Sequence, residues 1–177
     1  STVEFPDKFT SQMSISSGFN TKTAFQDYST YAGGKTDFLG VDDGTRDYPG
    51  LISSDKVVRG NYTDPQLQEI TSGFANNWNT TSKNAPINGS FKLNVGDKFE
   101  LGEQDVMGYI ASFSYANTFV TTQKQKNFYD FSGSRYDYDG NSYSSNVMWS
   151  GMLNLSYKLG LTNKISLKNI YNQNADD

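Results

Sequence analysis

Residues 146–159 read NVMWSGMLNLSYKL, and large apolar side chains alternate along them with small or polar ones. The even positions include Ser150, Asn154, Ser156 and Lys158. The odd positions hold Val147, Trp149, Gly151, Leu153, Leu155, Tyr157 and Leu159. Successive side chains of a β-strand point to opposite faces, so this two-residue period predicts a strand with one apolar and one polar face.

Four other segments repeat this alternation, and in all of them the apolar side chains fall on odd-numbered positions. Their even positions hold mainly Ser, Thr, Asn, Gln and Lys. The apolar residues of the four segments are Phe9, Met13, Ile15 and Phe19; Phe91, Leu93 and Val95; Tyr109, Ala111, Phe113, Tyr115 and Phe119; and Ile165, Leu167 and Tyr171. Five segments with one pattern predict an all-β fold, an antiparallel up-and-down meander of about five long strands.

The composition supports a β-rich fold and excludes several classes of function. Only 35% of the 177 residues are hydrophobic, but 15% are aromatic, whereas disordered chains contain few aromatic residues. The net charge is −4 and Lys and Arg form no cluster, so nucleic acid is not an expected partner. No stretch is apolar for long enough to cross a bilayer as a helix, which leaves crossing by β-strands open.

The chain contains no Cys and no His. It therefore has no thiol nucleophile, and it lacks the side chain that most often acts as a general base or binds a transition metal. Its paired carboxylates fall in expected loops, without apolar neighbours that would tune them for catalysis. We therefore expect no enzymatic activity and no cofactor.

The connections between the expected strands alternate between long and short. Residues 159–164 predict a tight turn, and residues 96–107 predict a longer return. Long loops are expected at about residues 26–89 and 128–145, the first with a short helix at residues 64–70 and Thr63 or Asp64 as its N-cap. In transmembrane barrels, short turns on the periplasmic side alternate in the same way with longer loops on the outer side. The two-residue period alone is equally compatible with a soluble β-sandwich, whose apolar face would be its core.

Short sequences spread over the whole chain resemble those of one family of membrane proteins. They include residues 1–9, STVEFPDKF, residues 17–21, SGFNT, and residues 31–46, YAGGKTDFLGVDDGTR. Trp78, residues 85–91, residues 155–157 and residues 164–172 add to the similarity. In this order, they resemble the plug–barrel junction and first barrel strands of a TonB-dependent outer-membrane receptor of the Bacteroidetes type.

The resemblance implies that residues 1–6 end a plug strand and that residues 7–177 form the N-terminal portion of a β-barrel. Barrels of this family have about 22 strands, so about five strands make only part of one. The implied location is the bacterial cell outer membrane, and the implied function is import of a bound ligand. The implied partners are outer-membrane lipid, the remainder of the barrel and plug, TonB through a plug segment missing from this chain, and a SusD-like lipoprotein. The alternative is a soluble β-sandwich binding module, for instance for carbohydrate.

A barrel would turn the odd-numbered strand residues toward lipid. The residues expected on this lipid-facing surface are Phe9, Met13, Ile15, Phe113, Tyr115, Trp149, Leu153, Leu155 and Leu167.

Two groups of loop residues are candidates for binding smaller molecules. Asp42, Asp43 and Asp47 have the oxygen atoms that Ca²⁺ prefers, but Asp-Gly pairs are also ordinary turn formers, and we expect a turn with no metal. Arg46 beside them is expected to form a local charge pair. Aromatic rings of the loops could stack on a ligand, and the candidates are Tyr28, Tyr31, Trp78 and Tyr136.

Overall fold

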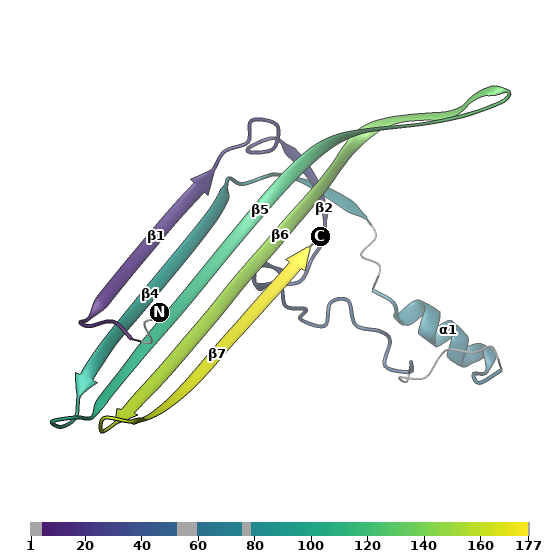
Figure 1. Ribbon diagram of the computed structural model, residues 1–177. Coiled ribbons are helices and arrows are strands. Elements are labelled where there is room, and N and C mark those ends of the chain that lie inside the picture. The colour runs from purple at the N-terminus through teal and green to yellow at the C-terminus, as the bar shows by residue number, and fades with distance from the viewer. Residues whose placement is uncertain (1–4, 53–59, 76–78, 177) are drawn as a thin grey trace.

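The computed structural model describes residues 5–52, 60–75 and 79–176 (Figure 1). Five strands form one antiparallel sheet in the order β1-β4-β5-β6-β7. Their bounds are Thr10–Gly18 for β1, Asn88–Glu100 for β4, Val106–Asp130 for β5, Gly133–Leu159 for β6 and Asn163–Asp176 for β7. The predicted all-β, up-and-down meander of about five long strands is confirmed. The five strands share one sheet and do not divide into the two facing sheets of a sandwich.

The strand register keeps odd-numbered residues on one face of the sheet and even-numbered residues on the other. Ile15 lies opposite Phe91, Phe91 opposite Tyr115, and Tyr115 opposite Trp149. We call the side of the sheet that carries these odd-numbered residues the odd face, and the opposite side the even face. Because side chains alternate along each strand, the pairing extends the apolar pattern of single segments across the whole sheet.

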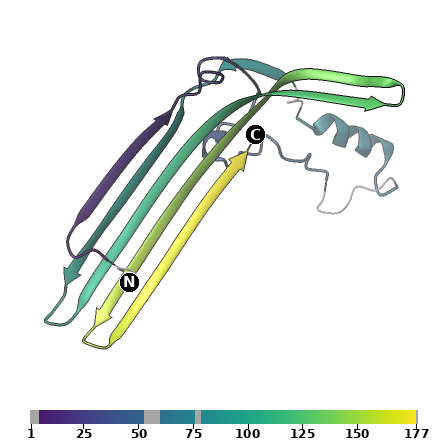
Figure 2. The ribbon, with the colours of Figure 1, turned by 45° about the horizontal axis from the view of Figure 1, so that its top comes forward.

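Both short turns lie at the same end of the sheet, which we call the short-turn end (Figures 1 and 2). The first connects β4 to β5 over residues 101–105, so the longer return expected over residues 96–107 is wrong, because β4 continues to Glu100. Within this turn the Leu101 N–H donates to the Asp105 carbonyl at 2.9 Å. The second connects β6 to β7 through Gly160, whose N–H donates to the Asp105 carboxylate at 2.8 Å. Asp105 thus joins the two turns.

The stretch expected to be a second long loop, about residues 128–145, is instead mostly strand. β5 and β6 remain paired as far as Asp130 and Gly133, with one irregularity between Phe128 and Tyr129. Phe128 and Tyr136 stack across the hairpin with ring centroids 5.6 Å apart. Tyr and Phe have a high strand propensity, and here it outweighs the turn-forming Gly and Asp residues that suggested a loop.

A long insertion between β1 and β4 holds the remaining elements. It contains β2 (Asp27–Tyr31), the short 3-10 helix η1 (Asp37–Leu39), α1 (Asp64–Gly73) and β3 (Thr80–Asn84), and β2 pairs with β3. The predicted helix is confirmed, and its N-cap is Thr63. The Thr63 N–H donates to the Gln66 side chain at 2.9 Å, which completes a capping box.

The sheet encloses very little core. The accessible surface of the whole chain is 13213 Å², whereas a compact protein of 19.7 kDa has about 8,600 Å². The buried hydrophobic residues, among those that the structure describes, are Ala24, Tyr28, Ile70, Ala85 and Val147. Most of them lie in or beside the insertion, so the sheet itself leaves both faces largely uncovered.

The N-terminal segment packs against the even face near the short-turn end. A Cβ added to Gly96 would lie 3.0 Å from Pro6, and a Cβ added to Gly108 would collide with Phe5. Ser156 lies opposite Gly108 on β6 and is only 3% exposed. Glycine and serine therefore leave the space on the even face that Phe5 and Pro6 occupy.

Substitution of Gly108 by Ala is expected to displace Phe5 and to destabilise the protein by about 1–3 kcal/mol, because the added methyl group overfills this contact. Tryptic cleavage after Lys8 should then become faster. Gly151→Ala is the matched control, since a Cβ there meets no atom within 4 Å. Equal cleavage rates in the two variants would contradict the packing of Phe5 on Gly108.

Candidate functional site

The odd face carries a band of mainly apolar side chains, many of which are exposed. Met13 is 61% exposed, Leu153 42% and Leu167 55%. The strand register places eight of the nine residues expected to face lipid on this one face, and Phe9 lies just before β1. Apolar surfaces of this kind are unusual on soluble monomers and occur where a protein contacts another protein, a ligand or a membrane.

Aromatic side chains border this band on two sides. Near the short-turn end lie Phe99, Tyr109 and Tyr157, and Phe99 stacks on Tyr109 with ring centroids 6.2 Å apart. The opposite border consists of the row Phe91, Tyr115 and Trp149. The apolar residues between the two borders include Leu93, Val95, Ala111, Phe113, Leu153, Leu155 and Leu167, and Asp97 and Asn169 are polar residues in the same region.

The separation of the two aromatic borders can be compared with the height of the apolar band of an outer-membrane barrel. At about 3.4 Å per residue, β6 advances about 27 Å between Trp149 and Tyr157. A strand tilt of about 40° reduces this advance to about 20 Å along a barrel axis. Barrels in the outer membrane have an apolar band about 25 Å tall between two girdles of aromatic residues.

The even face is mainly polar, and its small side chains bond to one another across the strands. Ser112 donates to Asn94 at 2.9 Å, and the hydroxyls of Ser114 and Ser150 lie 2.7 Å apart. Met148 and Ile170 are exposed apolar exceptions on this face. The contrast between the faces suits one apolar and one aqueous environment.

Arg46 organises the part of the insertion that follows β2. Its guanidinium makes two hydrogen bonds of 3.0 Å to the two carboxylate oxygens of Asp37 and lies 3.4 Å from Asp42. It also donates to the Tyr31 hydroxyl and lies 5.3 Å from the centre of that ring. These contacts with Asp37 and then Tyr31 raise the pKa of Arg46. The expected local charge pair is therefore present, and it involves Asp37 as well as Asp42.

Asp43 holds the same loop through its carboxylate. It accepts hydrogen bonds from the Lys35 N–H at 2.7 Å, from the Thr45 N–H at 3.2 Å and from the Thr45 hydroxyl. The Thr45 hydroxyl first and the Lys35 N–H second lower the pKa of Asp43. These bonds explain why the loop carries an aspartate here.

Gly33 and Gly34 allow the loop backbone to approach these carboxylates. A Cβ on Gly33 would collide with the Asp37 carboxylate, and a Cβ on Gly34 would collide with that of Asp43. Residues 31–46 thus form a loop that is held by hydrogen bonds among its own residues. Its glycines leave space for the aspartate side chains that accept these bonds.

The structure does not bring Asp42, Asp43 and Asp47 together as a metal site. Asp42 faces Arg46, Asp43 binds Lys35 and Thr45, and the Asp47 N–H donates to Gly44 at 3.1 Å. Within residues 5–52, 60–75 and 79–176, no three Asp, Glu, His or Cys side chains are grouped to hold a metal ion.

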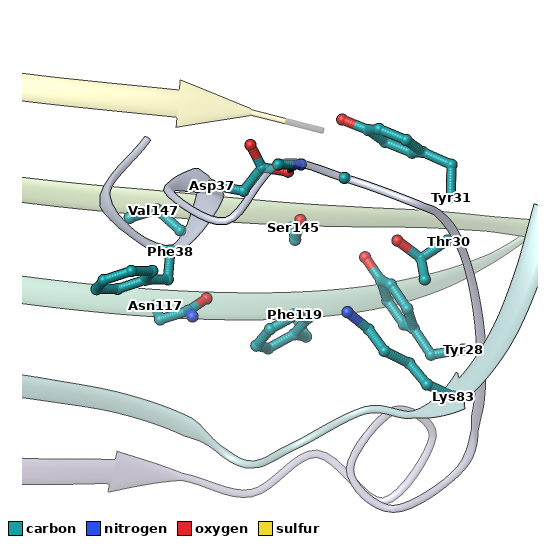
Figure 3. A pocket seen from close by; sticks show the side chains of 12 residues that line it. Tyr28, Thr30, Tyr31, Asp37, Phe38, Lys83, Asn117, Phe119, Ser145 and Val147 are labelled. Atoms are coloured by element: carbon teal, nitrogen blue, oxygen red, sulfur yellow. Dashed lines mark hydrogen bonds between the residues drawn. The ribbon is translucent and has the colours of Figure 1, made fainter. Parts of the chain in front are cut away.

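A cavity of about 230 Å³ lies between the insertion and the odd face (Figure 3). Tyr28 is 3% exposed and packs edge-on against Phe119 and Tyr143, with centroids 5.6 and 5.3 Å away. Lys83 and the buried amide oxygen of Asn117 supply polar groups to the wall. Asp37, Thr30 and Ser145 also line the cavity, so polar groups make up much of its wall beside the aromatic rings. Such a wall can bind a small polar molecule.

Two of the four aromatic candidates for ligand contact, Tyr28 and Tyr31, meet in this cavity. Tyr136 instead stacks within the β5–β6 hairpin, and Trp78 lies outside the described residues. Sequence reasoning missed Lys83 and Asn117, because only the pairing of β2 with β3 and the docking of the insertion bring them to the cavity.

Three side chains of the odd face bind the backbone of the insertion. The Tyr115 hydroxyl donates to the Phe38 carbonyl at 2.8 Å, and the Trp149 indole N–H donates to the Leu39 carbonyl at 2.8 Å. The Gln173 amide donates to the Gly40 carbonyl at 2.6 Å. Gly40 has a φ of 64°, and a Cβ there would lie 2.8 Å from Ala175. Glycine is therefore required at this position for both its conformation and its small size.

Substitution of Arg46 by Lys is expected to loosen residues 33–46, because an ammonium cannot replace the two-point contact with Asp37 and the bond to Tyr31. Amide hydrogen exchange of this segment should become faster in Arg46→Lys. Lys35→Gln serves as a control, since the loop uses the backbone N–H of Lys35. Unchanged exchange in Arg46→Lys would contradict the organising role of Arg46.

The order of the same loop should depend on pH through Asp43. Its pKa is lower in the folded loop than its ordinary value, so the stabilisation is present at neutral pH and disappears as the pH falls through that lowered pKa. Exchange in residues 33–46, corrected for the intrinsic pH dependence, should therefore accelerate in acid. Asp43→Asn should weaken this dependence, and an identical pH profile in both proteins would argue against it.

Comparison with protein-family models, with curated protein sequences and with solved structures finds no match for this chain.

Proposed function

We propose that this chain forms part of the wall of an outer-membrane β-barrel in a TonB-dependent receptor that imports a bound ligand. The odd face lies against lipid, and the even face lies toward the lumen. The observation that carries the proposal is the apolar band of the odd face, bordered by aromatic rows about 27 Å apart along β6. With the strand tilt of a barrel this spacing becomes about 20 Å along the axis, compared with an apolar band of about 25 Å in outer-membrane barrels.

The positions of the turns support an orientation in the membrane. Both short turns lie at one end of the sheet, while the insertion and the β5–β6 hairpin extend from the other end (Figures 1 and 2). In outer-membrane barrels short turns face the periplasm and long connections face outward. We therefore place the short-turn end in the periplasm and the cavity beside Tyr28 outside the cell.

The N-terminal segment supports the assignment of the lumen. Phe5 and Pro6 pack on Gly96 and Gly108, on the even face near the short-turn end. A chain that leaves a plug domain inside a barrel would reach the wall from this side. The plug and TonB partnership itself rests on the resemblance of residues 1–9 and 31–46 to the receptor family.

The two edges of the sheet support the idea that further strands complete the barrel. β1 and β7 are the outermost strands of the sheet, and the side chains of β1 are exposed along its whole length. Unprotected edges and an uncovered apolar face are liabilities in water. We propose that the remainder of the barrel pairs with both edges, and that a SusD-like lipoprotein is a partner on the outer side.

Substitution of Leu153 by Arg is expected to impair assembly in the outer membrane, because a lipid-facing Arg near the midplane costs about 2–4 kcal/mol. Heat-modifiable electrophoretic mobility of the membrane-extracted protein measures assembly. Met152→Arg is the matched control, one residue away on the even face. It should assemble normally, since the lumen accommodates charge.

Two outcomes would contradict the proposal. One is equal assembly of the Leu153→Arg and Met152→Arg variants, because the two faces would then meet similar environments. The other is a natural protein that is monomeric and cooperatively folded in buffer without detergent.

A further inference from the structure

The loop around η1 lies on the odd face at the border of the apolar band farther from the short-turn end. Tyr115 and Trp149 form this border, and both donate a hydrogen bond to the loop, to the carbonyls of Phe38 and Leu39. Gln173, in the same row on β7, binds the carbonyl of Gly40. Three adjacent strands therefore hold three consecutive carbonyls of the loop.

These hydrogen bonds give partners to backbone carbonyls that would otherwise be unpaired in a loop beside lipid. The carbonyls at the end of a helix have no partner within it, and an unpaired carbonyl is costly away from water. Here the aromatic border and Gln173 satisfy the last carbonyls of η1. The charged side chain of the segment, Asp37, turns to Arg46. The polar groups of the loop are thus largely satisfied within the protein.

The outward side chains of the loop are apolar. Phe38 is 57% exposed, Leu39 36% and Val41 44%. Figure 3 shows Phe38 on the side of the cavity nearer the short-turn end, and Tyr28 and Tyr31 on the opposite side. The exposed ring therefore stands at the edge of the apolar band and continues it.

We propose that residues 36–41 form an interfacial anchor that dips into the boundary between the headgroups and acyl chains of the outer leaflet, with Phe38 as its leading side chain. This inference rests on the proposed function, because it requires lipid against the odd face. The partner is the lipid surface itself, since the loop is continuous with the proposed lipid-facing band. Amphipathic helices that lie in this boundary bury their apolar side about 5–10 Å deep, which gives a scale for the anchor.

The anchor also gives the cavity a defined position. Phe38 belongs both to the anchor and to the wall of the cavity, which extends from it toward Tyr28 and Lys83. A molecule in the cavity would therefore sit just above the outer leaflet, on the outside of the barrel wall.

Site-directed fluorescence quenching tests the depth of the anchor. The chain contains no Cys, so single Cys residues can be introduced and labelled with an environment-sensitive dye. The natural full-length protein, otherwise free of Cys, is placed in phosphatidylcholine vesicles that carry a nitroxide near the headgroup or near the chain end. The labelled sites are Phe38→Cys, Leu153→Cys as the deep control and Asn141→Cys as the aqueous control.

The dye at position 38 should lose most emission to the shallow nitroxide, and the dye at position 153 to the deep one. The dye at position 141 should respond to a water-soluble quencher alone. If position 153 behaves as expected and position 38 behaves like position 141, the anchor is overturned while the proposed function stands. If position 153 is not quenched from lipid, the proposed function fails, and the anchor fails with it.

A second measurement separates anchoring from chance proximity. In the Tyr115→Phe, Trp149→Phe background both rings remain aromatic, but the donors to Phe38 and Leu39 are lost. Quenching of the dye at position 38 by the shallow nitroxide should then decrease, while that at position 153 should not change. Unchanged quenching at position 38 would overturn the role of the hydrogen bonds in holding the anchor.

Discussion

The common register of the five strands is the constraint on which the rest of the structure depends. Shifting any strand by one residue would move its apolar side chains to the opposite face. The turns help to prevent this shift, because Asp105 binds both its own turn and Gly160 of the neighbouring turn. Cross-strand contacts on the two faces, such as Ser114 with Ser150 and Phe113 with Trp149, add to the specification.

The insertion depends on this register in turn. Tyr115, Trp149 and Gln173 can hold three consecutive carbonyls because the pairing of β5, β6 and β7 places them in one row. Arg46 and Asp43 then give the loop internal order. The cavity beside Tyr28 exists because the ordered insertion and the odd face approach each other without filling all the space. The sheet thus positions the loop, and the sheet and the loop together form the cavity.

Much of the fold could be predicted, because strands and capped helices have local signals. The odd-position alternation identified the five strands of the large sheet, and the capping residue Thr63 marked the start of the helix. The paired strands β2 and β3 were missed, because the segment that contains them was expected to be a long loop. The extension of the β5–β6 hairpin was missed because Gly133, Asp137 and Gly140 are residue types that are common in turns. Of the candidate site, Tyr28 and Tyr31 were anticipated as loop aromatics, but Lys83 and Asn117 had no distinguishing signal, since many Lys and Asn residues occur in the chain.

The sequence by itself determined which side chains share a face, because a two-residue period is a property of the strand backbone. Only the tertiary structure decided what covers each face. Phe5 rests on Gly108 of the even face, and Leu39 is held by Trp149 of the odd face. These partners lie about a hundred positions apart, so their contact depends on how the whole sheet pairs and on where the insertion folds back. No local pattern encodes such a contact, and it is at these contacts that the candidate anchor and the cavity arise.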